Sequence, residues 1–167
     1  MYLILEYING GDLFQTYPRN HVFPHLKLRS LVKQLLEGVN EMSSRSYLHR
    51  DLKPSNIFIQ NNSDLREIPA DLDDIVIKIG DLGLTSKYDD VLSSVLCGTP
   101  GYIAPEVLKN SEFHPNSDMF SVGCILYQFM VGEALFSSTN REILMMKNTS
   151  FQIGELDSLY HTQQSNI

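Results

Sequence analysis

The sequence predicts one α+β domain that is mainly helical and has a few short strands. A chain of 167 residues with 43% hydrophobic side chains is long enough to bury a single core. Residues 26–45 carry apolar side chains at steps of three and four, which is the period of an amphipathic helix. Two short apolar runs, residues 57–59 and 75–79, have the composition of strands.

The first part of the chain is expected to form a strand, a turn and two helices. Residues 2–7 are an apolar run that predicts a strand. Residues 9–12, Asn-Gly-Gly-Asp, then combine turn residues with a helix-starting acid. We therefore expect a short helix over residues 12–17, ahead of the amphipathic helix over residues 26–45.

The two runs that predict strands are separated by an acidic stretch, residues 60–74, which we expect to be a solvated loop. Residues 83–105 show no regular period, and long loops of this kind inside compact domains are usually functional or disordered. Two further helices are expected over residues 118–131 and 140–147. We expect residues 148–167 to be a polar, loosely ordered tail beyond a domain formed by residues 1–147.

Charge and composition exclude several classes of protein. Thirteen Lys and Arg against twenty Asp and Glu give a net charge of −7, and no basic block offers a surface for nucleic acid. Cys97 and Cys124 lack the spacing of a zinc site or disulfide framework. The uncharged stretch between Asp118 and Glu133 is shorter than the ~20 residues that span a bilayer. We expect an intracellular, cytoplasmic location without membrane insertion.

One short run concentrates groups suited to phosphoryl transfer. Residues 49–56 read His-Arg-Asp-Leu-Lys-Pro-Ser-Asn, which places an acid, a base and an amide close together between a helix and a strand. Asp51 can orient and deprotonate a hydroxyl, Lys53 can balance charge, and Asn56 can hold Mg²⁺. Asp81, after the second strand, supplies a carboxylate for the same metal. A lone aspartate more often caps a turn or helix, but here each belongs to a longer motif.

Three motifs in order resemble those of serine/threonine protein kinases. Residues 49–56 resemble the catalytic loop of that family, and Asp81-Leu82-Gly83 resembles its Asp-Phe-Gly metal motif, with an apolar Leu82 expected to be packed as a plug. Residues 98–106 resemble the segment that closes the activation loop. The resemblance implies the mainly helical C-terminal lobe of a kinase, most like calmodulin-dependent members, with ATP and Mg²⁺ as cofactors.

The resemblance also implies roles for residues outside the catalytic loop. Thr99 would lie beside Asp51 and the substrate hydroxyl, and an ordinary role as a turn hydroxyl that bonds nearby backbone would coexist with this one. Asp118 would anchor the backbone of the catalytic loop, or be a plain helix N-cap. Residues implied on the nucleotide side are Glu6, Tyr7 and Ile8 at the hinge, Asp12 at the ribose and Phe58 beneath the adenine. For Asp12 a helix cap, and for Phe58 a core position, are the competing interpretations.

Regulation and substrate choice are implied by further residues of the motifs. Arg50, which follows His49, is the residue with which related kinases sense an activation-loop phosphate, so an upstream activating kinase and a site near Ser94 are expected. Glu106 has no suitable arginine later in the chain, so it is either exposed or paired by another chain. The net charge of −7 favours basic protein substrates, although Ser55 and Gln128 stand where basophilic kinases carry glutamates.

The residues that grip ATP from above in this family, a Gly-rich loop and a strand lysine, do not occur before the hinge. Two hypotheses from different classes therefore remain. The chain is part of a catalytic kinase and inactive alone, or it is a kinase-derived binding or regulatory module without catalysis. Retention of Asp51, Lys53, Asn56 and Asp81 together favours the first hypothesis.

Overall fold

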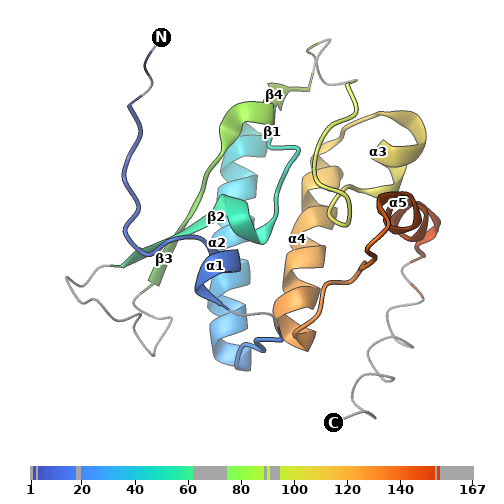
Figure 1. Cartoon of the computed structure of the whole chain (residues 1–167). Coiled ribbons are helices and arrows are strands. Elements are labelled where there is room, and N and C mark those ends of the chain that lie inside the picture. Colours follow the sequence, from blue (N-terminus) through green and yellow to red (C-terminus); the bar gives the residue numbers. More distant parts are fainter. Residues whose placement is uncertain are drawn as a thin grey trace.

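Two long helices packed side by side form the centre of the molecule (Figure 1). This computed structural model describes residues 2, 4–17, 20–61, 75–88, 90, 95–152 and 154. The central helices are α2 (His25–Ser44) and α4 (Pro115–Val131). The strands lie beside α2, and α3 (Pro105–Asn110) and α5 (Arg141–Ser150) lie on the far side of α4.

Helix α2 forms where the apolar period predicts it, within one residue at each end. Its buried side chains recur at steps of three and four along one face: Leu28, Leu31, Leu35 and Val39. Burial of this face against α4 supplies most of the stability of such a helix, since propensity alone contributes little in water. The opposite face is solvated and carries the exposed pair Lys33–Glu37.

Helix α4 begins earlier than the predicted residue 118. Pro115 occupies the first helical position, where its missing N–H is no loss, and the His114 N–H donates to Ser117 Oγ at 3.1 Å. The helix ends at Gly132, whose φ of +87° is the left-handed conformation that glycine adopts at low cost. Three added residues at the start bring Asp118 inside the first turn instead of at the cap.

Four short strands form two separate antiparallel pairs. β2 (Ile57–Asn61) pairs with β3 (Ile75–Ile79), with Ile57 opposite Ile79, and β1 (Tyr47–Leu48) pairs with β4 (Ser86–Lys87). The expected loop over residues 60–74 begins later than predicted because β2 continues to residue 61, and residues 62–74 lie outside the described part of the chain. Both pairs flank residues 49–56 and so fix the two ends of that segment.

The main hydrophobic core lies between α2, α4 and the β2–β3 pair. Its buried members include residues of all these elements, and α1 (Leu13–Thr16) adds Leu13. A second, smaller cluster lies under α3 and consists of Ile103, Ala104 and Val107. One cluster holds the segment that follows α2, and the other holds the segment that precedes α3. Both segments are held against the same helix, α4.

The prediction of a strand over residues 2–7 is wrong for the residues described there. Ile4 is 96% exposed and Tyr7 is 86% exposed, and no described strand pairs with this segment. A strand is stabilised by hydrogen bonds to a neighbour, and without one an apolar run stays extended and solvated. Figure 1 shows this segment running away from the body of the molecule.

The irregular segment predicted over residues 83–105 contains more structure than expected, and α3 begins at its end. A single turn, η3 (Leu82–Leu84), and strand β4 occupy its first part. Helix α5 continues to Ser150, beyond the predicted residue 147, and Asn148 is completely buried. Residue 153 and residues 155–167 lie outside the described part, so the tail stays a prediction.

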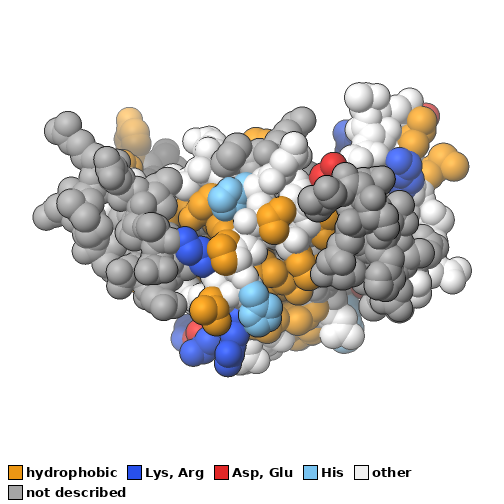
Figure 2. Space-filling model, turned by 90° about the horizontal axis from the view of Figure 1, so that it is seen from below, with side chains coloured by type: hydrophobic (Ala, Val, Ile, Leu, Met, Phe, Trp, Pro, Cys, Tyr) orange, Lys and Arg blue, Asp and Glu red, His pale blue; other side chains and the backbone are white. Residues whose placement is uncertain are grey.

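None of the helices in the described part of the chain is long and apolar enough to cross a bilayer. Cys97 is half-buried, Cys124 is buried, and neither forms a disulfide. Figure 2 shows the molecule from below, where hydrophobic side chains gather in the middle of the described surface and few acidic ones are seen.

Candidate active site

The carboxylate of Asp51 is the centre of a compact polar cluster. Thr99 Oγ1 donates to Asp51 Oδ1 at 2.6 Å, and Lys53 Nζ lies 2.9 Å from Asp51 Oδ2. Lys53 Nζ also donates to Thr99 Oγ1 at 2.8 Å, which closes a triangle of three side chains. Asp51 is only 9% exposed, so these charge-assisted contacts are shielded from water and correspondingly strong.

Asn56 completes the cluster from the other end of the same segment. A single turn, η1 (Pro54–Asn56), folds the chain back so that Asn56 Nδ2 donates to the backbone oxygen of Asp51 at 2.9 Å and to Asp51 Oδ2 at 3.3 Å. Pro54 at the start of the turn presets its backbone angle. The run of residues 49–56 is therefore a closed loop whose functional groups face one another.

Asp118 holds the start of this loop to α4. Its Oδ2 accepts from the His49 N–H at 2.8 Å and its Oδ1 accepts from the Arg50 N–H at 2.9 Å. Arg50 has a φ of +69°, a conformation that costs energy for a residue with a side chain and that the two hydrogen bonds help to hold. Burial raises the pKa of Asp118, and these two N–H donors oppose that rise.

His49 connects the loop to the strand that precedes Asp81. Its ring is fully buried, and Nε2 lies 2.9 Å from the backbone oxygen of Gly80. The Asp51 N–H donates to Nδ1 at 3.3 Å, so Nδ1 is the acceptor and Nε2 carries the proton donated to Gly80. This neutral ring fixes the position of Asp51 relative to the residue before Asp81.

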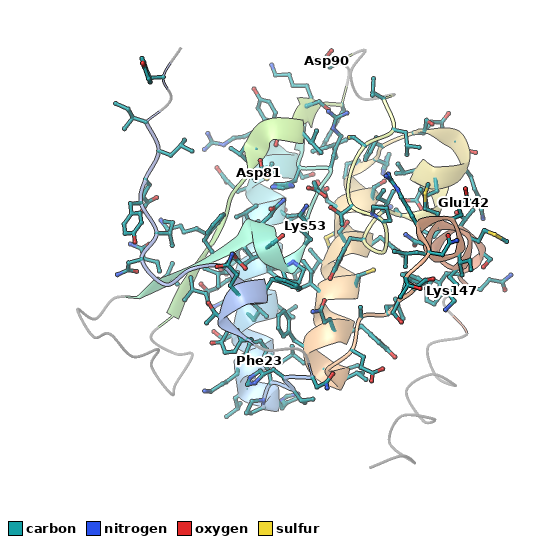
Figure 3. The ribbon with its side chains drawn as sticks, viewed as in Figure 1. Phe23, Lys53, Asp81, Asp90, Glu142 and Lys147 are labelled. Carbon is teal, nitrogen blue, oxygen red and sulfur yellow. The ribbon has the colours of Figure 1, made fainter. Side chains whose placement is uncertain are left out.

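Asp81 lies just past the paired ends of β2 and β3. The Gly80 N–H donates to the backbone oxygen of Asn56 at 2.9 Å. Asp81 is the next residue after Gly80, so this hydrogen bond brings its backbone near Asn56. Asp81 has a φ of +56° and an exposed carboxylate, whose Oδ1 accepts from the Gly83 N–H at 3.4 Å. Figure 3 shows Lys53 in the middle of the molecule and Asp81 above it.

The donor set of Asn56 and Asp81 fits Mg²⁺. An amide oxygen and a carboxylate are hard oxygen ligands, and Mg²⁺ usually takes only one or two carboxylates from a protein and keeps other ligands from substrate and water. The described residues contain no cluster of three His, Cys, Asp or Glu side chains that could enclose a metal. An open site of this kind suits a metal that arrives with phosphate groups.

Leu82 does not form the packed plug that the sequence led us to expect. Its side chain is 60% exposed, because no described segment packs over the turn that carries it. Leu82 instead lines a groove of about 590 Å³ between α2, β1 and β3. This groove does not include Asp51, Lys53 or Thr99, so it is separate from the polar cluster.

The residues expected on the nucleotide side are only partly brought together. Asp12 is buried and caps α1 through a hydrogen bond from the Gln15 N–H to Oδ1 at 2.9 Å, while its backbone pairs with that of Phe58. The half-buried Phe58 ring packs against Gly80, where a Cβ would lie 2.5 Å from it. The contact of the Asp12 side chain is therefore the helix cap.

The expected hinge residues lie outside this arrangement. Glu6 forms an exposed pair with Lys78 at 3.5 Å, Tyr7 is solvated, and Ile8 is half-buried. No described strand pairs with the extended backbone of residues 6–8, so the edges of this backbone face solvent.

Residues 98–104 form the wall opposite the loop of residues 49–56. Gly98 has a φ of +106°, and a Cβ there would lie 2.7 Å from the backbone oxygen of Arg50, so only glycine allows the two segments to approach. Tyr102 donates its hydroxyl to Gln128 Oε1 at 2.6 Å, and Ser121 Oγ donates to the Tyr102 oxygen at 2.7 Å. Burial raises the pKa of Tyr102 far above its usual value, so its hydroxyl stays a donor.

The residues expected to regulate the site have varied surroundings. Arg50 Nε donates to the Leu84 oxygen at 2.6 Å, and its guanidinium lies 5.2 Å from the centre of the Phe113 ring. Glu106 is exposed, and its Oε1 accepts a hydrogen bond from Ser117 Oγ at 3.2 Å. Ser94 lies outside the described residues.

Ser121 and Asn148 contact the wall segment but were not found from the sequence. Each contributes a single polar atom to a backbone oxygen, at Tyr102 and Ile103 respectively. Neither lies in the motifs named above, so the sequence offers no signal for either contact.

Comparison with known proteins identifies the pattern of motifs. Residues 1–166 match the model of the protein kinase domain. The chain is 36% identical over 137 residues to the serine/threonine-protein kinase unc-51 of Caenorhabditis elegans, covering 81% of this chain and 16% of that protein. It is 34% identical to the serine/threonine-protein kinase DCLK3 of Mus musculus, covering 95% of this chain and 19% of that protein.

A plant protein gives a similar match. The chain is 34% identical over 148 residues to the CBL-interacting serine/threonine-protein kinase 16 of Arabidopsis thaliana, covering 88% of this chain and 31% of that protein. The chain thus spans less than a third of the length of each of these three relatives.

Proposed function

The chain belongs to the protein kinase domain family, and from this premise we propose that it transfers the γ-phosphoryl group of ATP to serine or threonine hydroxyls of proteins. The observation that carries the proposal is the triangle of Asp51, Lys53 and Thr99. In it a hydroxyl already donates to the carboxylate at 2.6 Å while a cation lies beside both. An acceptor hydroxyl needs the same two neighbours.

Asp51 acts as the base in this proposal. A substrate hydroxyl that donates to Asp51 is oriented for attack and gives up its proton as the bond to phosphorus forms. Thr99 lies where it can support that hydroxyl. Lys53 stabilises the negative charge that builds on the transferring group, and its low exposure of 24% increases the strength of that interaction.

Asn56 and Asp81 would hold the magnesium ion through their oxygen atoms. Bound Mg²⁺ supplies neutralisation of the phosphate charge. Asn56 is held in place by its hydrogen bonds to Asp51, and Asp81 by its place after the anchored Gly80. Asp12, Phe58 and the backbone of residues 6–8 are proposed for the nucleoside part of ATP.

The proposal extends to substrates and regulation. The net charge of −7 favours substrates with a basic surface, through long-range attraction that salt weakens. Gln128 is an uncharged amide whose oxygen accepts from Tyr102, so it offers no charge for a specific basic side chain. Arg50 and a site near Ser94 are proposed to respond to an upstream activating kinase in the cytoplasm. We propose that the chain forms the C-terminal lobe of the catalytic domain and acts within a longer polypeptide.

An Asp51→Asn substitution tests this function in the full-length product of the gene. The measurement is ATP-dependent phosphorylation of histone or myelin basic protein. We expect kcat to fall by about 10²–10⁴, the usual contribution of a positioned base, because Asn cannot accept the proton. Asp90→Asn is the matched control, since Asp90 is exposed and lies far from Lys53 and Asp81 (Figure 3). An equal effect of both substitutions, or no activity in the wild type, would support a non-catalytic binding module instead.

A further inference from the structure

Helix α5 reaches the wall of the candidate active site through one polar contact. Asn148 is completely buried, and its Nδ2 donates to the backbone oxygen of Ile103 at 2.8 Å. Ile103 belongs to the segment of residues 98–104, which passes between α4 and α5 in Figure 1. A buried backbone oxygen needs a donor, and in the described part of the chain Asn148 supplies it.

Helix α5 is itself held firmly enough to act as a support. The ring of Phe151, at its C-cap, lies 5.2 Å from that of Phe136, and Phe136 in turn stacks 6.3 Å from Phe120 of α4. Lys147 Nζ donates to the Ser137 oxygen at 3.1 Å. Contacts on both sides of Asn148 in the chain therefore fix its position relative to α4.

The supported segment is held from two sides at consecutive residues. Ser121 of α4 donates to the oxygen of Tyr102, and Asn148 of α5 donates to the oxygen of Ile103. These two hydrogen bonds fix the orientation of two successive peptide groups. They thereby fix the position of the segment between the two helices. A segment held by one helix alone could rotate about its own axis.

The same segment leads directly to Asp51. The Ile103 side chain lies against Gly98, since a Cβ on Gly98 would come 3.2 Å from Ile103 Cγ1. Thr99 follows Gly98 and bonds both Asp51 and Lys53. The position of Ile103 is thereby transmitted to the hydroxyl of Thr99 within five residues of chain, all of it described.

One further feature separates Asn148 from an ordinary core residue. Its Oδ1 is buried without a hydrogen-bond partner in the described structure, which costs free energy. An apolar side chain of the same size would avoid that cost. The donor to Ile103 is therefore the property that distinguishes asparagine at this position.

We propose that Asn148 is a positioning residue that fixes residues 98–104 as the surface on which a protein substrate places its acceptor hydroxyl. The inference rests on the proposed kinase function and names a determinant of substrate binding within it. Asn148 touches neither Asp51 nor Lys53. Its loss should therefore weaken the use of a protein or peptide substrate more than the transfer of phosphoryl to water.

The test compares Asn148→Leu, which keeps the number of side-chain heavy atoms and removes the donor, with Asn148→Ser, which keeps a shorter donor. Asn140→Ala is the matched control, because Asn140 caps α5 through the Glu142 and Ile143 N–H groups and does not contact Ile103. In the full-length gene product, we expect Asn148→Leu to raise the KM for a serine peptide about tenfold, equivalent to ~1.4 kcal/mol. ATP hydrolysis without peptide should change less than twofold, and Asn148→Ser should recover part of the KM.

Amide hydrogen exchange gives a second measurement that needs no activity. Asn148→Leu should speed exchange at Tyr102, whose N–H bonds the Thr99 oxygen, while Asn140→Ala should not. An unchanged KM and unchanged exchange in Asn148→Leu, or equal changes in Asn140→Ala, would overturn the inference. A wild type that transfers no phosphoryl would overturn the proposed function alone, since the exchange measurement still decides the role of Asn148.

Discussion

Asp118 illustrates how one buried carboxylate organises the candidate site at the scale of single residues. It receives two backbone N–H groups from consecutive residues, His49 and Arg50, and so fixes the chain immediately before Asp51. Burial of this carboxylate disfavours its charged form, and so it raises the pKa of Asp118 despite both donors. The carboxylate therefore stabilises a local geometry at the expense of some stability at neutral pH.

An Asp118→Asn variant should be less stable than the wild type by about 1–3 kcal/mol, because its amide group faces one of the two N–H donors. The difference should depend on pH. Since the pKa of Asp118 is raised on folding, the unfolded wild type ionises first as the pH rises, and the wild type loses stability through that range. The asparagine variant has no such loss, so the difference in stability between the two proteins should narrow as the pH rises from about 4, the ordinary pKa of an aspartate.

Urea unfolding of both proteins across this pH range measures the gap, and titrations common to both proteins cancel in the comparison. A gap that widens as the pH rises would contradict the assignment of a raised pKa to Asp118. Such a result would mean that the two N–H donors outweigh the effect of burial.

The sequence reveals single residues only where a motif gathers them. Asp51, Lys53 and Asn56 fall within one short run, and the structure brings both Lys53 and Asn56 within hydrogen-bond distance of the Asp51 carboxylate. Asn148 acts from far along the chain through a single contact, which no spacing reports. Leu82 was expected to be packed, but exposure depends on what covers a side chain, and that is set by other segments.

At the scale of elements, the close approach of residues 98–104 to the catalytic loop depends on Gly98. Its φ of +106° and the 2.7 Å that would separate a Cβ from the Arg50 oxygen leave no room for a side chain. The Arg50 backbone is held by Asp118, so it cannot move aside without breaking those hydrogen bonds.

Gly98→Ala should therefore lower the free energy of unfolding by about 1–3 kcal/mol, the cost of a strained backbone conformation. Gly123→Ala is the matched control, because Gly123 lies inside α4 and a Cβ there meets nothing within 4 Å. Alanine should stabilise that helix by up to ~1 kcal/mol. Thermal unfolding of both variants decides the matter, and an equally stable Gly98→Ala protein would be inconsistent with this close approach.

Elements with a strong period are the ones that the sequence predicts well. Helix α2 carries a continuous apolar face and was predicted within one residue at each end. The prediction of a strand over residues 2–7 was wrong because a strand depends on a neighbouring strand to pair with, and composition does not reveal that neighbour. Helix α3, with six residues, is too short to show a period.

At the scale of the whole molecule, segments distant in sequence converge on α4. The loop of residues 49–56 is tied to it through Asp118, and residues 98–104 are tied to it through Ser121 and Gln128. Long-range packing of this kind holds Thr99 against Asp51. The motifs indicated the family that the comparisons show, whereas the convergence on one helix could be learned only from the structure.

The measurement that tests the account most directly is the Mg²⁺ dependence of phosphoryl transfer from ATP to a protein substrate, in the full-length gene product and its Asp81→Asn variant. If Asn56 and Asp81 hold Mg²⁺ beside Asp51, the wild type should require the ion. The variant should lose about 10²–10³ in kcat even at saturating Mg²⁺, because a charge that stabilises the transition state is misplaced. Transfer that persists unchanged in Asp81→Asn, or that needs no Mg²⁺ in the wild type, would contradict the proposed site.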